Sequence, residues 1–174
     1  MLRKIIYTIL VILLFVIQTT FSGAISLGNV APNLIIIIVC MYGLLRGRRA
    51  GMYIGFFAGL LLDVFFGIGD VMGINAMILM YIGFLNGIFN DMIYIKNYHI
   101  PVIAVAISTF AYEFFYYVFA FMIRNKLDLP YYLRHIIIPE IVYTVFVTLF
   151  LFKIILWIDS KIEKYEKRGE KSVD

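Results

Sequence analysis

Long apolar runs separated by short charged clusters make up most of the chain. As a helix, a run of about 20 apolar residues crosses the ~30 Å hydrocarbon core of a bilayer. The pattern therefore predicts an all-α, polytopic membrane protein with six transmembrane helices. The expected segments are Ile5–Phe21, Pro32–Leu45, Ala50–Phe66, Gly73–Phe89, Ile100–Ile123 and Ile136–Trp157. This division predicts a membrane domain over residues 1–158 and a charged tail over residues 159–174.

The second segment is the weakest of the six. Its length of about 14 residues gives a helix that rises only about 21 Å. It must therefore begin earlier, near Leu27, or thin the bilayer locally, or form a re-entrant hairpin. The basic residues favour a true crossing, because a hairpin would leave Arg46, Arg48 and Arg49 outside the cell.

Positive charge predicts the orientation of the chain, since loops rich in lysine and arginine stay in the cytoplasm. With the N-terminus inside, the cytoplasmic side holds Arg3, Lys4, Arg46, Arg48, Arg49, Lys96 and the lysines of the tail. Only Arg124, Lys126 and Arg134 lie on the opposite side. Both termini are therefore expected in the cytoplasm. The start of the chain resembles a signal peptide, but its apolar stretch is longer than usual and further segments follow it.

Composition supports a membrane protein and argues against nucleic-acid binding. Apolar residues make up 63% of the chain and charged residues 15%, whereas soluble domains average ~45–50% and ~25%. The net charge of +4 comes from residues that flank membrane segments, so membrane lipid is the expected partner and nucleic acid is not. The tail from Asp159 onwards is neutral overall and is expected to be a solvated helical extension.

Glycine follows a regular spacing in the third segment. Gly51, Gly55 and Gly59 recur every four residues, and a step of four advances only about 40° around a helix. The three therefore form one stripe, against which a neighbouring backbone can approach closely. We interpret the stripe as packing within the bundle, with an interface to another protein as the alternative. A matching pair in the fourth segment consists of Gly83 and Gly87.

Three carboxylates, Asp63, Glu113 and Glu140, lie inside the expected segments. Ionisable groups are costly in hydrocarbon, so such residues often serve a function. Helix rise places all three in the outer half of the membrane. The polar residues that reach the same depth are Gln18, Asn33 and Asn75.

This outer polar layer has two interpretations. The side chains either hydrogen-bond to one another and to nearby tyrosines, fixing the register of the bundle, or line an outward-facing cavity or groove for a ligand or partner. Catalysis is not expected, because the sequence has no phosphate loop, nucleophile elbow or zinc motif. His99 and His135, the only histidines, are expected in loops on opposite sides of the membrane. No cofactor and no metal is expected.

Several strings of residues together resemble the bacterial rod-shape-determining MreD family. They are Pro32–Leu34, Leu45–Gly51, Gly55–Asp63, Gly73–Ala76 and Pro139–Thr144, with Gly67, Gly69, Gly83 and Gly87. The resemblance extends over nearly the whole chain in length and order of segments. Thr144 departs from it, since the family is expected to favour asparagine there, although threonine can still hydrogen-bond.

The resemblance implies a non-catalytic scaffold of the cell-elongation complex in the bacterial cytoplasmic membrane. Its implied partners are the bitopic protein MreC, the actin-like MreB and peptidoglycan polymerases. The family is also structurally similar to the substrate-binding components of energy-coupling-factor transporters, six-helix proteins with an outward-facing pocket. That similarity supports an alternative function, capture of a vitamin-like small molecule, with Asp63, Glu113 and Glu140 as recognition residues.

Overall fold

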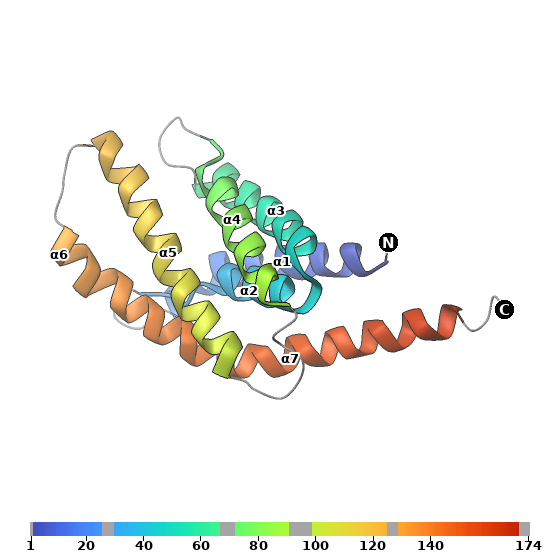
Figure 1. The fold of residues 1–174 in the computed structure, drawn as a ribbon. Helices are drawn as coiled ribbons and strands as arrows, with labels where there is room; N and C mark the ends of the chain where they lie inside the picture. Colours follow the sequence, from blue (N-terminus) through green and yellow to red (C-terminus); the bar gives the residue numbers. More distant parts are fainter. Residues whose placement is uncertain (1, 26–29, 67–71, 91–98, 125–128, 171–174) are drawn as a thin grey trace.

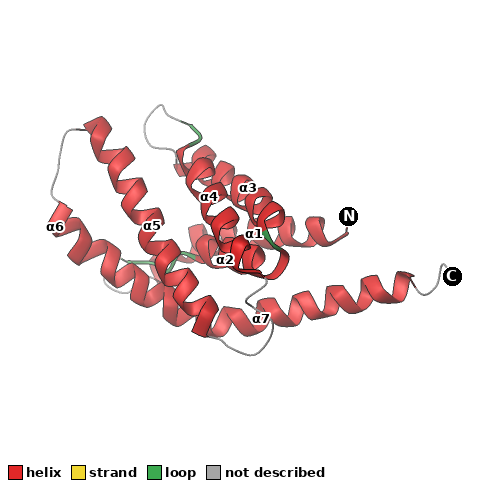
Figure 2. Ribbon diagram, in the orientation of Figure 1, coloured by secondary structure: helices red, strands yellow, loops and turns green. Residues whose placement is uncertain are grey.

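The computed structural model describes residues 2–25, 30–66, 72–90, 99–124 and 129–170 (Figure 1). Figure 2 shows that helices account for nearly all of this part of the chain. The fold is therefore all-α, as predicted. The helices are α1 (Leu2–Ile25), α2 (Leu34–Arg46), α3 (Arg48–Phe66), α4 (Ile74–Ile88), α5 (His99–Arg124), α6 (Leu129–Tyr132) and α7 (Ile138–Glu170). A π-helical turn, Leu133–Ile137, joins α6 to α7.

Polar contacts define two ends of the helical bundle. One, which we call the Glu113 end, holds the end of α3 and the starts of α2, α4 and α7. The other, the Asp159 end, holds the start of α1 and the ends of α2 and α4, while α7 passes through it. The six long helices therefore run alternately between the two ends.

The shortest of the six long helices, α2, lies at the centre of the bundle. All of its residues from Leu34 to Leu44 are buried, and those from Ile35 to Met41 have at most 1% of their surface exposed. A helix that is apolar on every side belongs in a core. Because neighbouring helices cover α2, its length of 13 residues need not match the thickness of a bilayer.

A single residue, Gly47, turns the chain from α2 into α3. Its φ of +83° lies in the left-handed region, which side chains with a Cβ rarely adopt. Its N–H donates to Gly43 O at 2.7 Å, and its own carbonyl accepts from Gly51 N at 3.0 Å. The sharp corner lets α2 and α3 pack side by side and holds Arg46 and Arg48 at one end of the bundle.

Length and composition identify three helical stretches as long enough to cross a membrane among the residues that the structure describes. They are Arg48–Phe66, His99–Phe119 and Pro130–Lys164. Three shorter apolar helices, Ile5–Thr20, Leu34–Arg46 and Ile74–Ile88, accompany them. The chain is a helical membrane protein.

The last predicted segment is longer than the sequence suggested. Helix starts at Leu129 and continues through the π-helical turn and α7 to Glu170. Pro139 has no N–H to donate to the carbonyl of His135, and its ring crowds that carbonyl. The widened turn just before it, closed by a bond from Ile138 N to Leu133 O, is the local response to this loss.

Two predictions about particular residues were wrong. His135 lies within the π-helical turn and His99 begins α5, so neither is in a loop. Asp159 and Ile162, placed in the solvated tail, are both buried, with 8% and 5% of their surface exposed. They are buried because α7 continues along the bundle and keeps one face against it.

Candidate functional site: the polar Glu113 end

The glycines singled out from the sequence form a seam between α3 and α4. A side chain at Gly51 would collide with Gly83 O, one at Gly55 with Leu79 O, and one at Gly59 with the backbone of Ala76. In each case the obstacle is main chain, which cannot move aside as a flexible side chain can. The two helices therefore approach closely enough for their backbones to touch.

The seam extends beyond the predicted stripe. Gly87 faces the backbone of Gly47 and Arg48, and a Cβ at Gly43 of α2 would lie 2.7 Å from Gly83 O. The sequence did carry a signal for Gly43, because Gly43 and Gly47 continue the four-residue spacing of Gly51, Gly55 and Gly59. The seam thus joins α2, α3 and α4, and these three helices form the closely packed part of the bundle.

At the Glu113 end, α2 begins inside the bundle and needs acceptors for its first N–H groups. Gln18 of α1 supplies one, since its Oε1 accepts from Leu34 N at 2.9 Å and from Ile35 N at 3.3 Å. Asn33 caps the same helix through its Oδ1, which accepts from Ile36 N at 3.1 Å. Buried helix starts require such partners, because neither lipid nor the protein core offers water.

The start of α4 is capped in the same way by Asp63, at the end of the glycine stripe. Its Oδ1 accepts from the backbone and side-chain nitrogens of Asn75, both at 3.1 Å, and its Oδ2 accepts from Ala76 N at 2.9 Å. Both Asp63 and Asn75 are buried. The carboxylate thus satisfies three N–H donors and lies at the positive end of a helix dipole.

Glu113 of α5 and Glu140 of α7 are neighbours, and each accepts a hydrogen bond from another part of the bundle. Tyr132 OH donates to Glu113 Oε2 at 3.3 Å, and Asn33 Nδ2 donates to Glu140 Oε1 at 3.4 Å. The π-helical turn lies between Tyr132 and Glu140 and sets how the two are placed around Glu113.

Two further contacts connect the starts of α4 and α2 with α5 and α7, the helices that carry Glu113 and Glu140. Tyr112 OH donates to Asn75 Oδ1 at 2.8 Å, and Asn33 N–H donates to the Thr144 hydroxyl at 3.0 Å. The threonine that departs from the family pattern therefore keeps a polar contact. All six residues of the predicted layer lie at this end: Gln18, Asn33, Asp63, Asn75, Glu113 and Glu140.

A cavity of about 300 Å³ lies among these residues. Its polar lining comes from five residues: Gln18, Thr19, Asn33, Asn75 and Glu113. Aromatic and aliphatic side chains such as Phe15, Leu62 and Tyr116 form the rest of the wall. The two interpretations of the polar layer are therefore compatible, since the side chains cap helices and also line a cavity.

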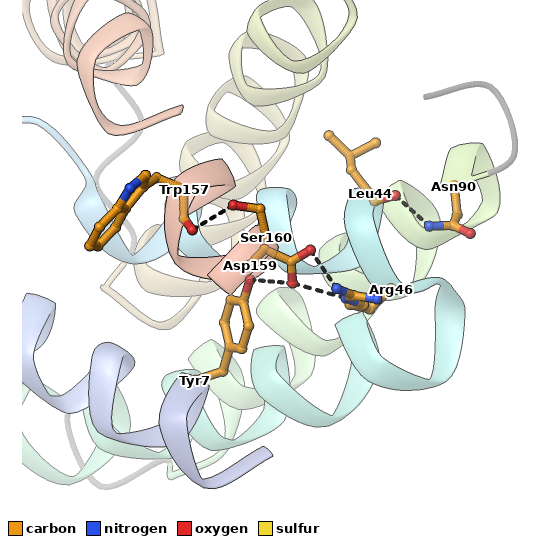
Figure 3. A network of polar contacts seen from close by, with 7 residues as sticks. All are labelled: Tyr7, Leu44, Arg46, Asn90, Trp157, Asp159 and Ser160. Carbon is orange, nitrogen blue, oxygen red and sulfur yellow. Dashed lines mark hydrogen bonds and ion pairs between the residues drawn. The ribbon is translucent and has the colours of Figure 1, made fainter. Parts of the chain in front are cut away.

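The Asp159 end holds a second polar network, which sequence reasoning missed (Figure 3). Asp159 Oδ1 accepts from Tyr7 OH and from Arg46 Nε, both at 3.0 Å, and its Oδ2 pairs with Arg46 Nη2. Nearby, Asn90 Nδ2 donates to Leu44 O at 2.6 Å. The network joins α1, α2 and α7 and occupies one of the three arginines of the predicted basic loop.

The other two arginines of that loop, Arg48 and Arg49, are exposed.

A further polar contact deeper in the bundle was also missed, because a single asparagine in an apolar run gives no spacing signal. Asn86 Nδ2 donates to Ile82 O and to Ser108 Oγ, both at 2.8 Å, which joins α4 to α5.

The polar groups at the Glu113 end provide recognition chemistry: hydrogen-bond donors, acceptors and one carboxyl pair around a small cavity. No group of three or more histidine, cysteine, aspartate or glutamate side chains is placed to hold a metal ion in the ranges that the structure covers. The fold and this site define a helical membrane protein whose helix ends meet in a polar-lined cavity.

Comparison with known families then gives the relationship. The rod shape-determining protein MreD family matches residues 1–161, and the chain belongs to that family. Comparison with curated proteins and with solved structures gave no match. Membership implies a role in rod-shape determination, in a family that is not known as an enzyme family.

Proposed function

We propose that this chain is a non-catalytic scaffold of the bacterial cell-elongation complex in the cytoplasmic membrane. The observation that carries the proposal is the family match over residues 1–161. The structure is consistent with a scaffold, because the polar groups described above mostly hold helices together. In this role the protein connects MreC and MreB to the polymerases that build the lateral wall.

We further propose six membrane spans, with both termini in the cytoplasm. The alternating course of the six long helices supports this topology, and so does the gathering of exposed Arg48, Arg49, Lys161 and Lys164 beyond the Asp159 end. The Glu113 end then faces outward, which is also the position of the pocket in the transporter components that the family resembles.

The surfaces available to partners follow from this topology. The exposed arginines of the α2–α3 corner and the extension of α7 would meet cytoplasmic partners such as MreB. The lipid-facing side of α7, which exposes Val142, Phe146 and Phe150, would pack against the transmembrane helix of MreC. Large apolar side chains on an unpaired helix face suit either lipid or a second helix.

Depletion tests the scaffold role. Cells that lose the protein should become round, and lateral wall synthesis should lose its organisation, while re-expression of the wild-type chain restores rods. In parallel, the tagged chain should co-purify with MreC from solubilised membranes. Normal rods after complete depletion, in a strain without a second copy of the gene, would reject the proposal.

A further inference from the structure

The described lining of the cavity at the Glu113 end carries one carboxyl group and no positive charge. Among the described residues that line it, Glu113 is the one charged side chain, and Glu140 is its neighbour. No lysine or arginine lines the cavity in the part of the chain that the structure describes. Asp63, the third carboxylate nearby, is committed to the start of α4. Among the described residues, Glu113 therefore faces the cavity with no cationic side chain beside it.

A second polar group, the amide of Gln18 in α1, also lines the cavity. Gln18 uses its carbonyl oxygen to cap α2, and among the described residues no acceptor takes the two N–H bonds of its amide. A ligand that meets both side chains carries a protonated amine for Glu113 and an oxygen acceptor for Gln18.

The size of the cavity limits what can occupy it. Ligand pockets commonly measure about 300–1,000 Å³, and this one, at about 300 Å³, lies at the lower limit. It has room for a small molecule or a lipid headgroup, and it is too small for a helix of a partner protein. Its apolar walls, which include Phe15 and Phe66, suit the beginning of an attached hydrocarbon chain.

We propose that this cavity binds a protonated amine, with Glu113 as its counter-ion, Glu140 supporting Glu113, and Gln18 donating to a neighbouring oxygen of the ligand. The amine belongs to a free small molecule or to the headgroup of a lipid in the leaflet that this end reaches. The proposal goes beyond the scaffold role and does not depend on it, since a scaffold and a capture protein could each carry such a site.

Lipid selectivity in the purified full chain provides the test. The protein is placed in nanodiscs containing equal amounts of phosphatidylethanolamine and phosphatidylglycerol with identical acyl chains, and bound lipid is measured by native mass spectrometry. Wild type should retain phosphatidylethanolamine over phosphatidylglycerol by about tenfold or more. Glu113→Gln keeps an acceptor for Tyr132 but removes the charge, and should bring the ratio close to one. Glu163→Gln, which removes a carboxylate outside the cavity, should leave the ratio unchanged.

A second arm distinguishes the two sources of the amine. Free ethanolamine is added to protein in nanodiscs of phosphatidylglycerol alone, and thermal unfolding is followed. Stabilisation of wild type but not of Glu113→Gln identifies a free small molecule as a sufficient ligand, whereas selectivity for the lipid alone identifies a headgroup. Either result supports the amine site. The absence of both effects in wild type, or the same effects in Glu113→Gln, would overturn it.

A steric variant keeps the test independent of the carboxyl pair. Ala31 lines the cavity from the segment before α2, so Ala31→Phe should fill the space while Glu113 and Glu140 stay in place. The variant should unfold at a temperature close to that of wild type in detergent and lose selectivity for the amine. Full retention of selectivity would show that the amine binds elsewhere, and would overturn the assignment of this cavity.

Discussion

At the scale of single residues, Gly55 offers the clearest test of the seam between α3 and α4. A leucine there would press its Cβ into the backbone carbonyl of Leu79, so the helices must separate. Overpacking a core costs about 1–3 kcal/mol when side chains can adjust, and backbone adjusts less. Gly55→Leu should therefore lower the free energy of unfolding by about 3 kcal/mol or more, measured by thermal or denaturant unfolding in detergent.

Phe57, two residues further along α3, is the matched control. Its side chain is exposed and contacts other aromatic rings on the outer face of the helix. Phe57→Leu should change stability by no more than about 0.5–1 kcal/mol. Equal losses in the two variants would show that the glycine stripe is not a packing face.

Asp63 tests whether the polar layer stabilises the fold through helix capping. Asp63→Ala leaves the N–H groups of Asn75 and Ala76 without their acceptor, and unsatisfied buried donors cost about 1–3 kcal/mol each. We expect a loss of about 2 kcal/mol or more, together with faster hydrogen exchange at those two amides. Asp63→Asn should be intermediate, because its amide keeps one acceptor oxygen. Unchanged exchange in the alanine variant would show that the start of α4 does not depend on the carboxylate.

At the scale of elements, the sequence predicted which segments form helices, because apolar periodicity and charged boundaries are local properties. It predicted less about what surrounds each helix. The short length of the second segment suggested an earlier start near Leu27, local thinning or a hairpin, and Leu27 lies outside the described residues. The structure explains the length by placing α2 inside the bundle. The burial of Asp159 was also missed. One signal was available, because Ile155, Asp159 and Ile162 follow one another at helical spacing and share a face.

The network of Arg46 and Asp159 joins three helices and can be measured by a double-mutant cycle. Arg46→Gln and Asp159→Asn each leave a partly buried group without its partner, whereas the double variant removes both charges. The coupling free energy should be about 1–2 kcal/mol, between the values typical of exposed and of buried pairs. Tyr7→Phe should add a smaller loss, since it removes one hydrogen bond to the same carboxylate.

Additive losses in that cycle would mean that the ion pair contributes nothing to holding α7 against α2. The exposed Lys161, which lies over the Trp157 ring at 5.4 Å, provides a control on the same helix. Lys161→Gln should show no coupling with Arg46→Gln, because additivity holds for residues without shared partners.

At the scale of the whole molecule, the sequence predicted that six polar residues would share one depth, since helix rise converts sequence position into height. It left open whether they would form a closed network or line a cavity. That distinction depends on how six separate helices tilt and which rotamers their side chains adopt, and neither follows from spacing along one chain. The capping role of Gln18 for a different helix is such a case.

The proposed topology can be tested by accessibility of single cysteines in intact cells. Cys40 is completely buried, so it should give little background, and Cys40→Ala removes it. Met72 is 71% exposed beside the start of α4, and Met72→Cys should react with a membrane-impermeant maleimide added from outside. Arg49→Cys and Lys164→Cys should react only after the membrane is permeabilised. Three helices, α4, α5 and α7, separate Met72 from Lys164, so labelling of both from one side would contradict six spans. Labelling of Arg49→Cys from outside would instead indicate that the second segment is re-entrant, because the arginine corner would then lie on the outer face.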